Sequence, residues 1–304
     1  MLNIVKRRYL YFGISLLVIV PGLIGYLLWG LPLAIDFTGG SLLEVQFNGT
    51  SPSEAEVTAL YLDQGVGEPR IQSSSGKVMI IRSKFMDNEA RTRLLDGMKA
   101  QFGDLTVLRF DSVGPTVGKE VTTRAAGAVA FAALAIMLYI TVAFRGVSHA
   151  FRYGASAIIA MLHDVAVVIG VSAIFGKVFG WEVDSLFLTA LLTVIGFSVH
   201  DSIVVFDRIR ENSTIYRRLP YETLVNHSIV QTLDRSINTQ LTVMFTLLAL
   251  TLFGGETIRH FVVTLLIGVF SGTYSSIFNA APILVVWENK EWRNWFGRNA
   301  ETLA

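Results

Sequence analysis

The chain has no cysteine among its 304 residues, and only 16% of them are charged. The lack of cysteine excludes disulfides and thiolate metal sites, and it leaves the redox compartment unread. A soluble domain carries about 25% charged residues, whereas this chain is 52% hydrophobic with a mean hydropathy of +0.52. No GxxxxGK[ST] stretch occurs, so the chain shows no nucleotide-hydrolysing loop. The composition predicts a polytopic α-helical membrane protein.

Six apolar runs have roughly the 17–25 residues that a membrane-spanning helix requires. The first run follows Lys6, Arg7 and Arg8, and its length and the missing A-x-A cleavage site favour a retained anchor over a signal peptide. Short connections predict that the later helices are antiparallel neighbours. The predicted spans are Tyr9–Trp29, Val121–Phe144, Tyr153–Phe175, Ser185–Phe206, Ile237–Phe253 and Phe261–Val286.

The positions of Lys and Arg in the short loops predict the orientation. These residues gather at the N-terminus, in loops 145–153 and 207–234, and in the C-terminal tail, whereas the opposite side has only Lys177 and Arg259. Both termini are therefore expected in the cytoplasm. The expected domains are 1–29 for the N-terminus and first helix, 30–119 for an external domain, 120–287 for a five-helix block, and 288–304 for a cytoplasmic tail.

The insert at 30–119 has the periodicity of a folded domain. Alternation predicts strands, helical spacing predicts two helices, and Ser53 is a plausible cap of the first helix. The resulting order, β-α-β-β-α-β, is that of a small α+β ferredoxin-like sheet. The predicted elements are strands Leu42–Phe47, Arg70–Gln72, Val78–Arg82 and Leu105–Phe110, and helices Ser53–Gln64 and Asp87–Phe102.

The cytoplasmic segment 207–236 is too polar to span a membrane. Its apolar residues are spread among charges, so we expect an interfacial amphipathic helix broken near Pro220. Docking of this segment onto a partner protein is the alternative.

Two His-Asp pairs lie inside adjacent predicted spans: His163 with Asp164, and His200 with Asp201. At about 1.5 Å per residue, Asp164 lies near mid-bilayer and Asp201 about 10 Å inside the cytoplasmic charges. A carboxylate at such a depth is costly and marks a functional site by default. Carboxyl and imidazole groups there can exchange protons. The alternative is that each aspartate only accepts hydrogen bonds from polar side chains of neighbouring helices.

Arg235 opens the fifth predicted helix. A guanidinium keeps its proton at working pH, so Arg235 cannot carry one, but it can hold Asp201 ionised and release it when the geometry changes. The alternatives are that Arg235 reaches the cytoplasmic headgroups or pairs with Asp234.

Glycines mark both junctions of the insert. The first junction is Asp36, Phe37, Thr38, Gly39 and Gly40, and the second is Gly114–Gly118. Tight turns are the expected role of these glycines, and hinges are the alternative.

Taken together, these motifs resemble the SecF family, the smaller half of the SecDF accessory of the bacterial Sec translocon, in the resistance-nodulation-division superfamily. The resemblance covers nearly the whole chain. It rests on the stretches Ile35–Gly40, Gly114–Gly118, Leu162–Val165 and Gly196–Asn212, of which the last is long and specific.

The resemblance implies a protein-translocation subunit of the bacterial inner membrane. With SecD, such a subunit uses the proton-motive force to promote export of unfolded preproteins through the SecYEG channel, and YajC and SecA are further candidate partners besides membrane lipid. No nucleic-acid partner, cofactor or metal is implied. This chain carries no fused SecD half, so SecD is expected as a separate chain.

The resemblance also implies roles for single residues. The family's proton-relay carboxylate in the fourth helix corresponds to Asp201, and its fifth-helix arginine to Arg235. His163, Asp164 and His200 are candidate polar support. Relatives commonly have Asn where this chain has His200, which leaves the driving ion open between proton and sodium.

Three other functions compete with this interpretation. A small-molecule exporter of the same superfamily would carry larger external domains and twelve helices. An intramembrane aspartyl protease would carry Gly-x-Gly-Asp, whereas Asp201 follows Ser-Val-His, so we expect no enzyme. A purely structural scaffold predicts that the charge of Asp201 has no effect.

Overall fold

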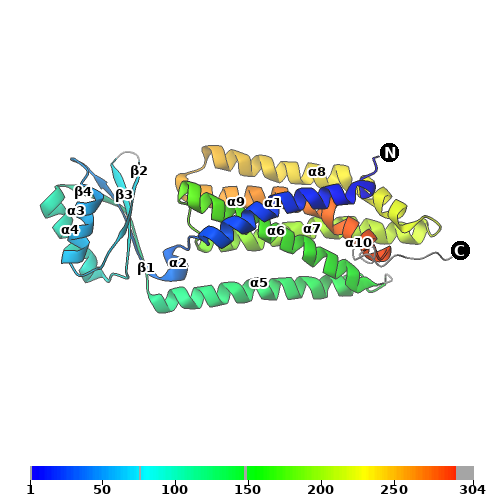
Figure 1. Cartoon of the computed structure of the whole chain (residues 1–304), viewed down its shortest axis with the longest axis horizontal. Helices are drawn as coiled ribbons and strands as arrows, with labels where there is room; N and C mark the ends of the chain where they lie inside the picture. Colours follow the sequence, from blue (N-terminus) through cyan, green and yellow to red (C-terminus); the bar gives the residue numbers. More distant parts are fainter. Residues whose placement is uncertain (1, 75–76, 147–148, 292–304) are drawn as a thin grey trace. The chain divides into compact units, whose positions relative to one another are not determined.

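The computed structural model describes residues 2–74, 77–146 and 149–291. The chain divides into two compact units, each with its own hydrophobic core (Figure 1). The membrane unit contains the chain up to Pro32 and from Ala128 onward, and the sheet unit contains Leu33–Gly127. Helix α5 (Pro115–Ala143) begins in the sheet unit and ends in the membrane unit.

Within the described part of the chain, six helical segments are long and apolar enough to cross a bilayer, which confirms the prediction of six spans. The first span combines a short 3₁₀ turn with α1, and the sixth joins two α-helices through a π-helical turn. The remaining spans are single helices. The elements are η1 (Val5–Arg7), α1 (Arg8–Trp29), α5, α6 (Ala150–Phe179), α7 (Ser185–Ile215), α8 (Tyr221–Phe253), α9 (Glu256–Ser275), η2 (Ser276–Ala280) and α10 (Ala281–Glu288).

Glycines allow α1 to cross α6 closely. A Cβ atom added to Gly22 would lie 2.8 Å from the Cα atom of Gly170, and one added to Gly170 would lie 2.6 Å from the Cα atom of Gly22. Small residues at such crossings bring helix backbones together, which gains dispersion energy inside a bilayer. The first helix is thereby attached to the other helices of the membrane unit.

The segment 207–236 is helical with a break near Pro220, as the sequence predicts, but it belongs to two long helices and is not a separate helix. Helix α7 instead continues to Ile215, and α8 starts at Tyr221 after the N-cap Pro220. The two helices run past the apolar part of the spans and pack against each other. The break near Pro220 is present, but it is the turn between two long helices.

Some of the apolar residues of this segment are buried between α7 and α8, whereas Ile215, Tyr216 and Leu219 near the break are exposed. The Asn212 amide of α7 reinforces the packing, because it donates to Ser228 Oγ at 2.8 Å and to Gln231 Oε1 at 2.9 Å on α8. Buried side chains then fill the contact. They are Ile209, Leu224, Val225 and Ile229.

The sheet unit has the predicted ferredoxin-like fold. Its four antiparallel strands lie in the order β2-β3-β1-β4, and the chain order is β-α-β-β-α-β. Alternate strand residues and the two helices α3 and α4 enclose one core. The elements are α2 (Ile35–Thr38), β1 (Gly40–Phe47), α3 (Glu54–Asp63), β2 (Arg70–Ser74), β3 (Val78–Ser83), α4 (Asn88–Phe102) and β4 (Leu105–Val113), and the core includes Leu43, Val45, Phe47, Tyr61, Ile81, Leu94 and Met98.

A capping box starts α3, and its N-cap is Ser53, as the sequence predicts. The Glu56 amide donates to Ser53 Oγ at 3.3 Å, and the Ser53 amide and hydroxyl both donate to Glu56 Oε2 at 2.8 Å. These two hydrogen bonds from Ser53 hold the pKa of the Glu56 carboxyl below its usual value. Because the folded-state pKa is lowered, the box contributes stability above the usual Glu pKa and loses it as the pH falls through the folded-state pKa.

Replacing Glu56→Gln should weaken the first turn of α3. Amide hydrogen exchange of the full-length chain in detergent should show faster exchange in residues 54–57 of the variant at neutral pH. The difference from the wild type should disappear as the pH falls through the folded-state pKa of Glu56, because both side chains are then uncharged. Glu54→Gln, on the same turn, is the matched control, and equal exchange at neutral pH would contradict the role of the box.

Candidate functional site

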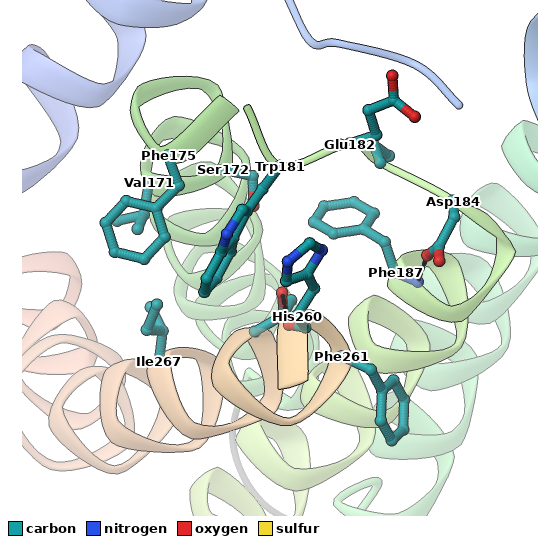
Figure 2. Close-up of a pocket in the computed structure, with 12 residues that line it drawn as sticks. Val171, Ser172, Phe175, Trp181, Glu182, Asp184, Phe187, His260, Phe261 and Ile267 are labelled. Atoms are coloured by element: carbon teal, nitrogen blue, oxygen red, sulfur yellow. Dashed lines mark hydrogen bonds between the residues drawn. The ribbon is translucent and has the colours of Figure 1, made fainter. Parts of the chain in front are cut away.

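A small cavity lies where the turn between α6 and α7 meets the start of α9 (Figure 2). Trp181 and His260 stack there, with ring centroids 4.1 Å apart and planes at 23°. The cavity volume is about 20 Å³, which is room for roughly one water molecule. Neither Asp164 nor Asp201 lines it. This cavity is too small for a substrate, so the functional site is sought at the buried carboxylates.

Asp164, in the middle of α6, is a buried carboxylate with hydrogen-bond partners on two other helices. Its side chain accepts from the hydroxyls of Ser198 on α7 and of Ser271 and Ser275 on α9, each at 2.6 Å. His163 Nδ1 lies 2.9 Å from Asp164 Oδ1. The aspartate is only 1% exposed. One carboxylate thus joins three helices.

These contacts suit an ionised Asp164 and leave little room for a protonated one. An ionised carboxylate only accepts hydrogen bonds, and three hydroxyls and an imidazole surround this one. A buried charge is tolerated only when it is paired and hydrogen-bonded. The arrangement therefore favours a role in holding α6, α7 and α9 together.

Asp201, in the second half of α7, is also buried but has different hydrogen-bond partners. It is 3% exposed, and its hydrogen bond comes from Gln240 of α8, whose Nε2 donates to Asp201 Oδ2 at 2.5 Å. Its neighbour on the same helix, His200, acts on it electrostatically. With a single amide donor, this carboxyl is not committed to the ionised form as Asp164 is.

Sequence reasoning missed Gln240, Ser236 and the three serines around Asp164. Small residues such as Ser271 and Ser275 in the last helices predict close helix packing, and the sequence does not show that they contact Asp164. The available signal was spacing, because Ser271 with Ser275, and Ser236 with Gln240, are four residues apart and share a helix face.

A line of serines connects the surroundings of the two carboxylates. Ser202 Oγ donates to Ser276 Oγ at 3.1 Å, and Ser276 Oγ donates to the Ser198 carbonyl at 2.9 Å. Ser276 opens the π-helical turn η2, a deviation that is frequent at functional sites. Gly272 permits the close approach, since a Cβ there would lie 3.3 Å from the Cα atom of Ser198.

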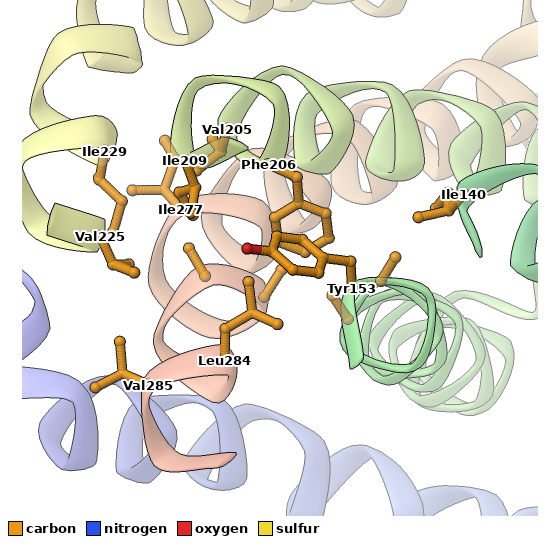
Figure 3. Packing of buried hydrophobic residues seen from close by; sticks show 14 of the residues in the cluster. Ile140, Tyr153, Val205, Phe206, Ile209, Val225, Ile229, Ile277, Leu284 and Val285 are labelled. Atoms are coloured by element: carbon orange, nitrogen blue, oxygen red, sulfur yellow. The ribbon is translucent and has the colours of Figure 1, made fainter. Parts of the chain in front are cut away.

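Beyond Asp201, an apolar cluster anchors one end of α8 (Figure 3). Val205, Phe206 and Ile209 of α7 belong to it together with Val225 and Ile229 of α8. Along α8 the buried residues run from Leu224 to Gln240, and none follows up to Phe253. Asp201 therefore contacts α8 at the limit of its anchored part.

The structure does not pair Arg235 with Asp201. Arg235 is exposed, and no ion pair among the described residues joins the two. Gln240 occupies the position beside the carboxylate, and five residues of helix separate the directions of the two side chains by about 140°. His200 is also exposed and points away from the buried site.

Polar residues form an exposed stripe on each of α7 and α8, within spans that are otherwise apolar. The threonine hydroxyls of both stripes donate to carbonyls of their own helices, as Thr189 and Thr242 do. Among the described contacts, the side chains of His200, Arg235 and Asn238 make no such hydrogen bond to their own helix, and polar groups without partners are costly in lipid. The stripe residues are Thr189 and His200 on α7, with the exposed Gly196 between them, and Arg235, Asn238, Thr242 and Thr246 on α8.

The two glycine junctions lie against each other within the sheet unit. A Cβ on Gly39 would lie 2.8 Å from the Cα atom of Pro115, and one on Gly118 would lie 2.7 Å from the Gly39 nitrogen. Thr122 Oγ1 donates to the Phe37 carbonyl at 3.2 Å. Gly39 and Gly40 also have φ values of +72° and +129°, which favour glycine. Close approach and turn geometry therefore explain these motifs structurally.

Metal binding finds no support in the clusters of ligand-type side chains. Among the described residues, no group of three or more His, Asp and Glu is placed to hold an ion. The two carboxylates therefore remain as the candidate ionisable centres.

Two family models match the chain. The model described as "Protein export membrane protein SecD/SecF, C-terminal" matches residues 94–290, and "SecD/SecF GG Motif" matches residues 30–50. The protein translocase subunit SecF of Anaerolinea thermophila is 61% identical over 304 residues, and the match covers 99% of each chain. The chain belongs to the SecF family. It is a multi-pass membrane subunit of protein translocation.

Solved structures of SecDF have the same fold. The crystal structure of SecDF from Thermus thermophilus, described as a translocon-associated membrane protein, matches with a TM-score of 0.80 and 33% identity over 95% of this chain. A SecDF structure in a super-membrane-facing form matches with a TM-score of 0.68 and 31% identity over 98% of this chain. The matches cover only 39% and 40% of those chains, so SecDF contains much that this chain does not.

Asp164→Asn should destabilise the membrane unit. The variant places an NH₂ donor where serine hydroxyls already donate, and each polar group left unsatisfied in the interior costs about 1–3 kcal/mol. We expect a lower unfolding temperature of the purified chain in detergent. Asp201→Asn is the matched control and should change that temperature little, because the single amide donor at Asp201 can be met by the new carbonyl. Equal stability of Asp164→Asn and wild type would contradict the tethering role.

Proposed function

We propose that this subunit acts with SecD to promote preprotein export and that the proton-motive force drives the step through Asp201. The observation that carries the proposal is the difference between the two buried carboxylates. Asp164 has four partners that suit its ionised form, whereas Asp201 has one amide donor and lies where the anchored part of α8 ends. Only Asp201 is arranged to change its charge without loss of the helix packing.

The energy available from one ion suffices for such a step. One charge that crosses 100 mV gives about 2.3 kcal/mol, and a pH gradient adds to it. Loss of the Asp201 charge changes the attraction between α7 and α8, so α8 can shift against α7. The second half of α8, whose side chains are half-buried or exposed, then transmits the change.

A role for Arg235 follows from its position. It belongs to the exposed polar stripe of α8, so it reaches Asp201 only after a rotation of α8, or it acts on a carboxylate of a partner chain. In this proposal, Arg235 pairs with Asp201 in a second conformation of the helix. His200 tunes the electrostatics around Asp201, and His163 orients the Asp164 carboxylate.

The polar stripes on α7 and α8 support a partner in the membrane. Lipid would leave His200, Arg235 and Asn238 without hydrogen bonds, so a partner's transmembrane helices or water must cover them. The SecDF relatives are single chains of which this chain matches little more than a third. SecD is therefore the proposed occupant, and SecYEG, YajC, SecA and the preprotein complete the assembly.

The distribution of Lys and Arg supports an inner-membrane location with both termini in the cytoplasm and the sheet unit outside. We further propose that the chain is not an enzyme, since the intramembrane aspartates belong to separate hydrogen-bonded clusters. Export of small molecules would need larger external domains than this sheet unit of about 95 residues.

Translocation of a preprotein into vesicles that carry this chain and SecD tests the proposal. After the ATP-driven stage, an imposed proton gradient should speed translocation in the wild type. Translocation by the Asp201→Asn variant should be no faster with the gradient than without it, because the amide cannot take up and release a proton. Asp207→Asn, the same change on the exposed face of α7, is the matched control and should respond as the wild type.

Each other outcome has a distinct meaning. An equal response of Asp201→Asn and wild type would refute Asp201 as the coupling site and would direct the search to Asp164 or to the partner. If wild-type translocation responds to a sodium gradient and not to a proton gradient, the motor function stands and its driving ion is sodium.

A further inference from the structure

Gln240 offers both a donor and an acceptor beside Asp201. Its Nε2 donates to Asp201 Oδ2 at 2.5 Å, while its Oε1 is buried and has no hydrogen-bond partner among the described residues. Gln240 is 2% exposed. One turn earlier on α8, Ser236 Oγ is also buried and unpartnered within that part of the chain. An unsatisfied buried acceptor costs free energy, so the unpartnered Oε1 of a side chain in contact with the carboxyl points to a donor that is present only part of the time.

The carboxyl of Asp201 itself can be that donor. An ionised carboxylate only accepts hydrogen bonds, whereas a protonated carboxyl also donates one through its O–H. A side-chain amide can serve both forms from one position, because half a turn about its last side-chain bond exchanges the NH₂ and C=O groups. Leucine and methionine, of similar size, serve neither form, and lysine could serve only the ionised one.

We propose that Gln240 is the positioning residue that responds to the protonation state of Asp201. Its NH₂ group donates to the ionised carboxylate, and its C=O group accepts from the O–H of the protonated carboxyl, with Ser236 Oγ as a second acceptor one turn away. This inference rests on the proposed function, because it assigns the group through which a proton on Asp201 acts on α8. The proton itself stays on the carboxyl, and no bond of Gln240 breaks.

The surroundings leave this task to Gln240. The titratable group that acts on Asp201 is His200, its neighbour on α7, whose side chain is exposed. From η2, the nearby Ser276 hydroxyl already donates to the Ser198 carbonyl. From α8, Arg235 points to the exposed face and Asp234 is exposed as well. Gln240 is the side chain of α8 that is hydrogen-bonded to the carboxyl.

Infrared difference spectroscopy of the full-length chain with SecD in lipid, between high and low pH, tests the inference directly. The band of the protonated Asp201 carboxyl is assigned by its loss in Asp201→Asn. In Gln240→Leu this band should move to higher wavenumber, because the O–H loses its acceptor and the carboxyl C=O bond strengthens. Thr251→Val, whose hydroxyl bonds to its own helix near the other end of α8, is the control and should leave the band in place.

A pair of exchanged side chains provides the functional arm. Asp201→Asn combined with Gln240→Glu keeps one carboxyl and one amide in contact but swaps their helices. The double variant should recover part of the gradient-driven translocation that Asp201→Asn alone loses, and Gln240→Leu should lose most of it. A fold defect would instead lower the unfolding temperature of Gln240→Leu and leave the band where it is.

The outcomes separate this inference from the proposed function. An unmoved Asp201 band in Gln240→Leu, with gradient-driven translocation intact, would overturn the role of Gln240 alone. A wild type without any pH-dependent Asp201 band would overturn both. A shifted band in a complex that ignores the proton gradient would keep the Gln240 contact and refute the motor.

Discussion

The hydrogen bonding of the Asp164 carboxylate is the constraint on which the membrane unit depends. A charge inside the bundle must be surrounded by donors, and these donors come from two other helices: Ser198 from α7, and Ser271 and Ser275 from α9. They can reach the carboxylate only if α7 and α9 lie in close contact, which Gly272 permits. The helix positions are therefore specified by polar geometry as well as by apolar packing, which is weakly directional in lipid.

The second carboxylate shows how one functional group takes a different role in a different environment. Asp164 and Asp201 are buried to nearly the same extent, so burial alone does not separate them. The number and kind of hydrogen-bond partners separate them. Serine hydroxyls and an imidazole surround Asp164, whereas Asp201 contacts one amide, which can donate or accept. Rigid support and a switchable contact thus lie on the same helix α7, about one turn apart at Ser198 and Asp201.

Much of this fold follows from patterns in the sequence, because length and hydropathy define spans, and alternation defines strands. Asp201 and Asp164 were also found, since a carboxylate in an apolar run is rare. The sequence could not show that Gln240, and not Arg235, lies beside Asp201 in this structure, because that depends on the rotation of α8 about its axis, which Leu224, Val225 and Ile229 determine through contacts with α7. The packing of segment 207–236 was open for a related reason: an amphipathic pattern shows that a helix has an apolar face and does not show what covers it.

The anchoring of α8 explains why its contact with Asp201 has consequences at a distance. Buried side chains hold this helix up to Gln240, and from there to Phe253 none is buried. A change of hydrogen bonding at the last fully buried position alters how the second half of α8 packs against α9. The same change deeper in the anchored half would meet the packed side chains of Val205, Phe206 and Ile209 and would be resisted. Placing the switchable carboxyl at this boundary lets a small rearrangement of one amide move many residues while the Asp164 cluster keeps the other helices in place.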